Sequence, residues 1–163
     1  MIADDIEPIL CLFETVAAER IYIGTEPGFD RAAYRARLER GLLRDAMPTW
    51  VVIADDAPSA LTGTPTIGQL GIWMSDDDGP TLGMMIAPPF RGHGLGRLLL
   101  QTAMAWTRDA GYTTLALLVF PHNRAAIALY RAMGFEQVAY YERDVRRQNG
   151  EVWDTILMQQ RLS

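Results

Sequence analysis

A glycine-rich segment joins a predicted strand to the most regular predicted helix of the chain, and it limits the possible folds more than any other feature. The segment runs Ala87-Pro-Pro-Phe-Arg-Gly-His-Gly-Leu-Gly-Arg97. Its glycines allow the backbone to approach a ligand closely, and the start of the following helix presents unpaired N–H groups with the positive end of the helix dipole behind them. Such a helix start binds phosphate oxygens well, so the sequence predicts an α/β protein with an anion-binding loop.

Two common phosphate-binding loops do not fit the spacing of this segment. A dinucleotide-binding G-x-G-x-x-G pattern that starts at Gly92 requires glycine at position 97, which is arginine; one that starts at Gly94 requires glycine at position 99, which is leucine. A nucleoside-triphosphate loop requires a lysine, and all fifteen basic residues of the chain are arginine. We therefore exclude both classes of nucleotide site.

The pattern of apolar and turn residues along the chain predicts a sheet flanked by helices. Asp4 or Asp5, Asp30 and Asn123 are suited to cap helices, and Gly111 and Gly134 to end them. We expect helices at 4–20, 30–43, 95–110 and 123–133, and strands at 49–54, 67–75, 81–87, 115–120, 135–145 and 152–162.

Three of these strands carry more specific expectations. The segment 115–120 is continuously apolar, which is typical of a central strand covered on both faces. The turn at 76–80 predicts an antiparallel hairpin between the strands on either side. Asn149-Gly150 predicts a second hairpin with positive φ at both residues.

Composition narrows the remaining classes of function. The chain has 163 residues, of which 49% are hydrophobic and 21% charged, and this predicts a single folded domain over residues 1–163. A net charge of −5 disfavours nucleic acid as a partner. Cys11, His93 and His122 are too few for a structural zinc site, so we expect no metal. A start unlike a signal peptide, and no long apolar run, predict a cytoplasmic protein without a membrane partner.

Two segments resemble the signatures of one known family. Arg91-Gly-His-Gly-Leu-Gly96 has the order arginine or glutamine, two residues, glycine, one residue, then glycine or alanine. Asn123 to Phe135 follows a predicted buried strand and contains an asparagine, a leucine-tyrosine pair and a glycine-phenylalanine pair. Both segments resemble the GNAT family of N-acetyltransferases, strongly over residues 81–162 and in outline before that. The resemblance implies a mixed, mostly antiparallel sheet that opens between the strands at 81–87 and 115–120.

The resemblance also implies a cosubstrate, acetyl-CoA, and the residues that bind it. In the family, the loop amides hold the pyrophosphate of acetyl-CoA, and the preceding strand pairs with its pantetheine arm. The implied acetyl-CoA-binding residues are Met84, Ile86, Arg91, Gly92, His93, Gly94, Leu95, Gly96 and Asn123.

Tyr130 is the residue to which the resemblance assigns catalysis. A phenol can donate its proton to a thiolate that develops beside it. The alternative is a core aromatic residue whose hydroxyl is hydrogen-bonded at the sheet edge. No carboxylate lies on the two strands that open, so the general base stays undetermined. Its candidates are Glu14, Glu19, Glu26, Asp154 and a chain of water molecules.

The implied reaction is direct acetyl transfer to a primary amine of a small molecule, an amino acid or a peptide N-terminus, and the acidic composition favours a cationic acceptor. Two alternatives remain: a non-catalytic module that binds or senses acetyl-CoA, and a transferase of a longer acyl group. A homodimer is compatible with the sequence. The chain departs from the family at its start, where only Met1-Ile-Ala precedes Asp4, so we expect the first strand to be short or missing.

Overall fold

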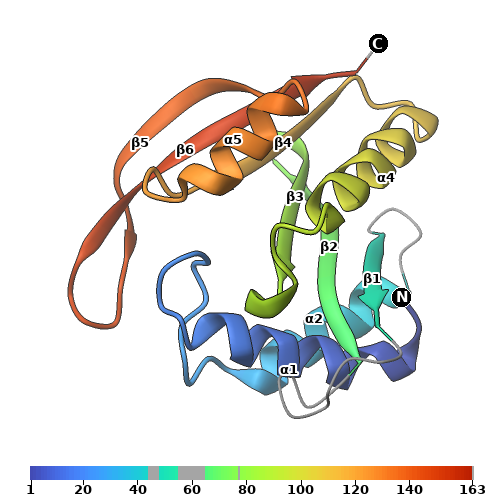
Figure 1. Ribbon diagram of the computed structural model, residues 1–163, viewed down its shortest axis with the longest axis vertical. Helices are drawn as coiled ribbons and strands as arrows, with labels where there is room; N and C mark the ends of the chain where they lie inside the picture. Colours follow the sequence, from blue (N-terminus) through green and yellow to red (C-terminus); the bar gives the residue numbers. More distant parts are fainter. Residues whose placement is uncertain (44–47, 55–64, 77, 163) are drawn as a thin grey trace.

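The computed structural model describes residues 1–43, 48–54, 65–76 and 78–162, which form a six-stranded sheet with helices on both faces (Figure 1). The strand order is β1-β2-β3-β4-β6-β5, and all neighbours are antiparallel except β3 and β4. This confirms the predicted mixed, mostly antiparallel α/β fold. The strands are β1 (Thr49–Ile53), β2 (Thr66–Ser75), β3 (Gly79–Ile86), β4 (Thr114–Val119), β5 (Glu136–Arg146) and β6 (Val152–Arg161); the helices are α1 (Ile6–Ala17), α2 (Arg31–Leu42), α4 (Leu95–Asp109) and α5 (Arg124–Ala132), with 3-10 turns η1 (Ala3–Asp5) and η2 (Pro88–Phe90).

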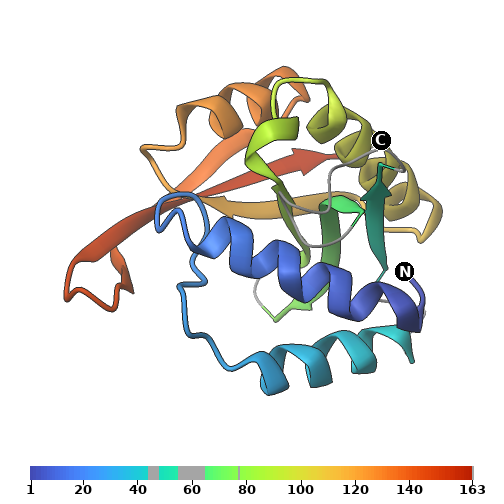
Figure 2. The same cartoon turned by 60° about the horizontal axis from the view of Figure 1, so that its bottom comes forward.

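The two faces of the sheet carry separate apolar cores. On one face, Leu100 of α4 and Ile127 of α5 pack in a cluster that includes Leu82 of β3. On the other face, α1 packs Leu12 against a cluster that includes Met85 of the same strand. Figures 1 and 2 show α1 and α2 on one side of the sheet, with α4 and α5 on the other. Strand β3 is therefore fixed from both sides, immediately before the glycine loop.

The described ends of α2, α4 and α5 follow the predicted capping chemistry. The Asp30 carboxylate accepts the Ala33 amide at 2.9 Å, and the Asn123 side-chain oxygen accepts the Ala126 amide at 3.3 Å. Gly111 and Gly134 follow α4 and α5 with φ of +84° and +87°, a conformation that glycine adopts without strain. None of the helices in the described part of the chain is long and apolar enough to cross a membrane.

No strand precedes α1, and residues 1–5 are all described. They contain the turn η1, and the Met1 amine donates to the Thr49 carbonyl of β1 at 3.0 Å. The Asp5 carboxylate accepts the Ile2 amide at 2.6 Å and makes no cap hydrogen bond to α1. The expectation of a short or missing first strand is confirmed, whereas the predicted aspartate cap is wrong because the η1 turn uses that carboxylate.

The two predicted hairpins both form, but one has a different turn. Ser75 pairs with Gly79 across the first hairpin, and residue 77 of its predicted turn lies outside the described residues. In the second hairpin only Gly150 has positive φ, at +87°, and the Arg147 amide donates to the Glu151 carbonyl at 2.8 Å. The loop thus contains three residues, 148–150, and ends on a left-handed glycine. Positive φ at Asn149 was therefore a wrong prediction.

Strands β3 and β4 are hydrogen-bonded over a very short stretch. Their register contains only Thr81 with Ala116 and Leu82 with Leu117, and beyond these pairs the strands part, as predicted (Figure 1). The parting leaves Leu118 of β4 49% exposed. The prediction that this strand is covered on both faces is therefore wrong at the point where the sheet opens.

Candidate active site

The glycine loop presents unpaired amides at the start of α4. Gly92 and Gly94 have φ of +79° and +83°. The first hydrogen bond of the helix runs from the Leu98 amide to the Gly94 carbonyl at 3.1 Å, so the amides before Leu98 have no partner within the helix. With the positive end of the helix dipole behind them, these amides form a site suited to phosphate oxygens.

Gly96 brings the loop close to the opened part of the sheet. A Cβ atom at this position would lie 2.9 Å from a methyl group of Leu129 on α5 and 3.5 Å from the Met84 methyl group on β3. A larger residue at this position would require the Leu129 side chain to shift away from α4. The N-terminus of α4 is thereby placed beside the unpaired part of β3.

A cavity of about 630 Å³ lies along this loop, and we call it the loop cavity. Its walls come from β3, the glycine loop, the start of α5 and the segment after α1. It is lined by Val16, Tyr22, Ile23, Met84, Met85, Ile86, Arg91, Gly92, Gly94, Gly96, Arg97, His122, Asn123, Arg124, Ala125, Ala126, Leu129 and Tyr130.

The arginines of the loop cavity differ in whether a carboxylate of the chain already pairs with them. Arg91 donates to both oxygens of Glu19 at 2.8 and 2.5 Å, and through Nε to the Ile86 carbonyl at 2.9 Å. Arg97 and Arg124 form no ion pair with the described residues. Arg91 therefore holds the end of α1 against the loop, while Arg97 and Arg124 are better placed to neutralise an anionic ligand.

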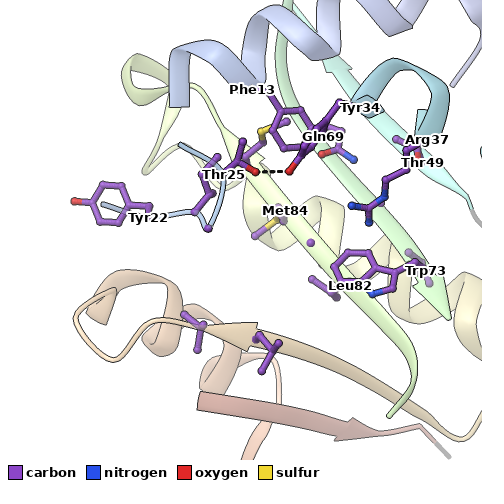
Figure 3. A pocket seen from close by; sticks show the side chains of 18 of the residues that line it. Phe13, Tyr22, Thr25, Tyr34, Arg37, Thr49, Gln69, Trp73, Leu82 and Met84 are labelled. Carbon is purple, nitrogen blue, oxygen red and sulfur yellow. Dashed lines mark hydrogen bonds between the residues drawn. The ribbon is translucent and has the colours of Figure 1, made fainter. Parts of the chain in front are cut away.

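A second cavity, of about 400 Å³, lies between α1, α2 and the sheet, and we call it the aromatic cavity (Figure 3). It shares six lining residues with the loop cavity: Tyr22, Ile23, Met84, Met85, Asn123 and Tyr130. Its other lining residues are Met1, Gly24, Thr25, Gly41, Phe13, Tyr34, Arg37, Leu38, Thr49, Gln69, Gly71, Ile72, Trp73, Leu82, Gly83, Leu118, Val119, Phe120, Asp144, Val145 and Thr155. The two cavities thus meet where β3 and β4 part.

Tyr130 lies at this junction. Its side chain is buried, and burial raises the pKa of its hydroxyl to about 12. The hydroxyl makes no hydrogen bond with the described residues, although its ring packs 5.9 Å from that of Phe135. The hydrogen bond at the sheet edge that the alternative interpretation requires is therefore not found in the described chain, and the phenol stays protonated at neutral pH.

Asn123 and the segment after α1 complete the junction. Asn123 uses its side-chain oxygen to cap α5 and lines both cavities. The Arg147 guanidinium donates to the carbonyls of Ile23 and Gly24 at 3.1 and 3.2 Å and lies 4.2 Å from the centroid of the Trp153 ring. The Arg147 side chain is only 1% exposed, and it therefore fixes the segment after α1, which forms a wall of the cavities, to the β5–β6 hairpin.

None of the four carboxylates proposed from the sequence as general base lines either cavity. Glu14 pairs with Arg31, Glu19 with Arg91 and Glu26 with Arg20 and Arg147, while Asp154 accepts the Tyr140 hydroxyl at 2.5 Å. Asp144 does line the aromatic cavity, where it accepts the Thr155 hydroxyl at 2.5 Å. It lies in a bulge of β5, between the register positions Tyr141 and Val145. No sequence pattern predicted this bulge.

With this geometry established, the relatives of the chain can be compared with it. A sequence profile described as the Acetyltransferase (GNAT) family matches residues 14–135. The chain belongs to this family. Mycothiol acetyltransferase of Thermobifida fusca (strain YX) is 32% identical over 68% of this chain and 31% of its own length. The chain spans about a third of the length of several curated relatives that it matches.

Two further GNAT proteins are similar over most of their length. A putative [ribosomal protein bS18]-alanine N-acetyltransferase of Bacillus subtilis (strain 168) is 29% identical over 71% of this chain and 74% of its own. The solved structure of a phosphinothricin acetyltransferase from Sinorhizobium meliloti, in complex with AcCoA, has a TM-score of 0.83 at 19% identity and covers 100% of this chain and 86% of that one. These likenesses support the GNAT fold and leave the acceptor open.

The structure brings together most of the residues that the family resemblance implied. His93 and Leu95 are not among the lining residues of either cavity. The sequence analysis missed the aromatic cavity, because its residues come from α1, α2, α5 and all six strands and form no contiguous motif. Those of the implied acetyl-CoA-binding set that line the loop cavity are Met84, Ile86, Arg91, Gly92, Gly94, Gly96 and Asn123.

The raised pKa of Tyr130 makes the stability of the fold depend on pH above 10. Burial favours the neutral phenol, so the folded state binds this proton more tightly than the unfolded state, whose tyrosine titrates near 10.0. The resulting stabilisation is complete below pH 10 and is lost as pH rises towards 12. We expect Tyr130→Phe to lose about 1 kcal/mol less free energy of unfolding than the wild type between pH 9 and pH 11. Urea unfolding at both pH values measures this, and equal losses in both proteins would contradict it.

Proposed function

We propose that this protein is an acetyl-CoA-dependent N-acetyltransferase that moves an acetyl group directly to a primary amine of a small molecule, an amino acid or a peptide N-terminus. The observation that supports this most strongly is the meeting of two cavities at the parting of β3 and β4. One cavity contains a phosphate-binding helix start, the other is lined by aromatic side chains, and Tyr130 lies where they join. A donor and an acceptor bound in the two cavities would meet beside a protonated phenol.

Acetyl-CoA fits the loop cavity in charge and in shape. The loop amides and Arg97 would hold the pyrophosphate, and the edge of β3 from Gly83 to Ile86, which has no partner on β4, would pair with the pantetheine arm. Acetyl-CoA would supply an acetyl group activated as a thioester. A backbone N–H of this β3 edge would stabilise the negative charge that develops on the carbonyl oxygen.

Tyr130 would donate the proton that the reaction requires at sulfur. As the amine nitrogen forms a bond to the acetyl carbon and the carbon–sulfur bond breaks, the hydroxyl would give its proton to the departing thiolate and regain one from solvent. Its buried position keeps it protonated until then. The free hydroxyl, without a partner in the described chain, is available for this hydrogen bond.

Asp144 would accept the proton that the amine loses. Among the carboxylates of the described chain, it is the one that lines a cavity at the junction. Its hydrogen bond from Thr155 fixes the side chain towards the β4 and β6 side of the aromatic cavity. From there it can receive a proton directly or through one water molecule.

Release of the free thiol of coenzyme A with a panel of primary amines tests the proposed function. The chain contains no lysine, so its own side chains add no ε-amine acceptor to the assay. Tight acetyl-CoA binding without thiol release above background, for every amine, would favour the non-catalytic module. Faster turnover of a longer acyl-CoA than of acetyl-CoA would favour the alternative transferase.

The loop can be tested by adding one methyl group. Gly94→Ala places a side chain at φ +83° in the glycine loop, where the pyrophosphate would bind. We therefore expect acetyl-CoA affinity, measured by calorimetric titration, to fall by about tenfold. Gly111→Ala is the matched control, because Gly111 has φ +84° and lies at the other end of α4. Both variants have the same backbone strain, so an equal effect on affinity would count against the loop as the site.

Removing the Tyr130 hydroxyl should separate chemistry from binding. We expect Tyr130→Phe to lower kcat about 100-fold, because the phenol no longer protonates the thiolate, while acetyl-CoA affinity stays nearly unchanged. Tyr141→Phe on the exposed face of β5 is the control and should behave as the wild type. Wild-type turnover by Tyr130→Phe would remove Tyr130 from this role.

Asp144→Asn should make turnover depend on the amine's own ionisation. We expect kcat/KM at neutral pH to fall about tenfold or more, and to recover as pH approaches the pKa of the acceptor amine, because a neutral amine needs no base before it attacks and water can take the proton that its nitrogen loses afterwards. Asp154→Asn is the control, since Asp154 is hydrogen-bonded to Tyr140 outside both cavities. A wild-type pH profile in Asp144→Asn would show that another group accepts the proton.

A further inference from the structure

Arg37 of α2 is an exposed residue that lines the aromatic cavity with unused hydrogen-bond donors. Its guanidinium lies 5.3 Å from the centroid of the Trp73 ring, and Figure 3 shows it between Gln69 and Trp73. No carboxylate in the described part of the chain pairs with it, whereas Arg31 and Arg35 of the same helix pair with Glu7. An arginine that lies within cation–π distance of an aromatic ring and has no anionic partner is suited to bind the carboxylate of a ligand.

Gln69 gives an independent indication that a polar ligand group binds here. The residue is only 7% exposed, lines the aromatic cavity, and its side-chain amide forms no hydrogen bond with the described residues. Its amide atoms are not enclosed by protein, so they face the cavity and are open to a ligand group. The Gln69 amide therefore offers a second polar group to a ligand that Arg37 holds in this cavity.

Two glycines leave the floor of the cavity open at this point. Gly71 of β2 and Gly83 of β3 face each other in the register. A Cβ atom at Gly71 would lie 2.9 Å from Nε2 of Gln69, and one at Gly83 would lie 3.0 Å from the Trp73 ring. A larger residue at Gly71 would displace the Gln69 amide, and one at Gly83 would press on the Trp73 ring. We call the site formed by Arg37, Gln69 and Trp73 the anion site.

The arginine end of the anion site lies away from the place where acetyl transfer would occur. Arg37 contacts Trp73, which pairs with Thr81, and Thr81 precedes Met84 at the junction by three residues, or about 10 Å along β3; Gln69 lies nearer to the junction, because it pairs with Met85. Asp144, the proposed base, lies on the opposite side of the cavity, towards β4 and β6. A ligand that reaches both sites needs its amine and its carboxylate several bonds apart.

We propose that the acceptor is a primary amine whose far end carries a carboxylate, as in a short peptide, and that Arg37 and Gln69 bind this carboxylate. This inference rests on the proposed function, because it assigns the acceptor of that reaction. The aromatic rings of Phe13, Tyr34 and Trp73 would contact the apolar part of the acceptor between its two ends. The net charge of −5 favours cationic acceptors over the whole surface, but within this cavity the positive charge of Arg37 attracts a carboxylate.

The test compares the dipeptide alanyl-phenylalanine with its C-terminal amide. We expect the wild type to use the acid with a kcat/KM at least tenfold above that of the amide, and Arg37→Gln to reduce this ratio to near one by losing activity on the acid alone. Arg40→Gln is the matched control, since Arg40 is exposed on the same helix, as Arg37 is, but does not line the cavity. Because the ratio is internal to each variant, a partly unfolded preparation does not change it.

The outcomes separate this inference from the proposed function. Equal use of acid and amide by the wild type, or an equal loss of selectivity in Arg40→Gln, would overturn the anion site while acetyl transfer stands. If no amine releases thiol, calorimetric binding of N-acetyl-alanyl-phenylalanine and its amide takes the place of turnover. Binding of the acid to the wild type but not to Arg37→Gln would then support the anion site without transfer. Equal binding of acid and amide would overturn it.

Discussion

The candidate active site depends on where one ladder of backbone hydrogen bonds ends. Strands β3 and β4 pair through two residue pairs and then separate. Beyond the pairs, β3 packs Met84 against the core under α4 and α5 and Met85 against the core under α1. A longer ladder would close the sheet and remove the junction. The unpaired edge of β3 is thus both a gap in the sheet and the surface that a ligand backbone would complete.

Three contacts hold the other elements of the site around the gap between β3 and β4. Gly96 allows α4 to approach α5, Arg91 joins the end of α1 to the glycine loop, and Arg147 joins the segment after α1 to the β5–β6 hairpin. Two of these contacts are made by arginines that bind carbonyl groups or carboxylates from distant parts of the chain. The walls of both cavities therefore combine these long-range polar contacts with residues of the apolar cores, such as Leu82 and Met85.

The glycine-loop half of this site could be predicted from the sequence, whereas little of the acceptor half in the aromatic cavity could. The glycine loop and the Asn123 cap are local, since each is set by a few consecutive residues and can be recognised from their spacing. Asp144 lies in a bulge, and Arg37, Gln69 and Trp73 come from a helix and a strand that meet only in the folded chain. The wrong predictions also concern tertiary context: the cover of Leu118 and the extra residue in the last hairpin depend on neighbouring strands, not on local preference.

The junction of the two cavities has a consequence for inhibition. Because six residues belong to both linings, a single continuous space runs from the glycine loop to the aromatic rings. A molecule that links coenzyme A through a two-carbon bridge to a peptide amine could occupy that whole space at once. It would combine two modest affinities without the entropic penalty of a second association, and its peptide portion would set its selectivity among GNAT proteins.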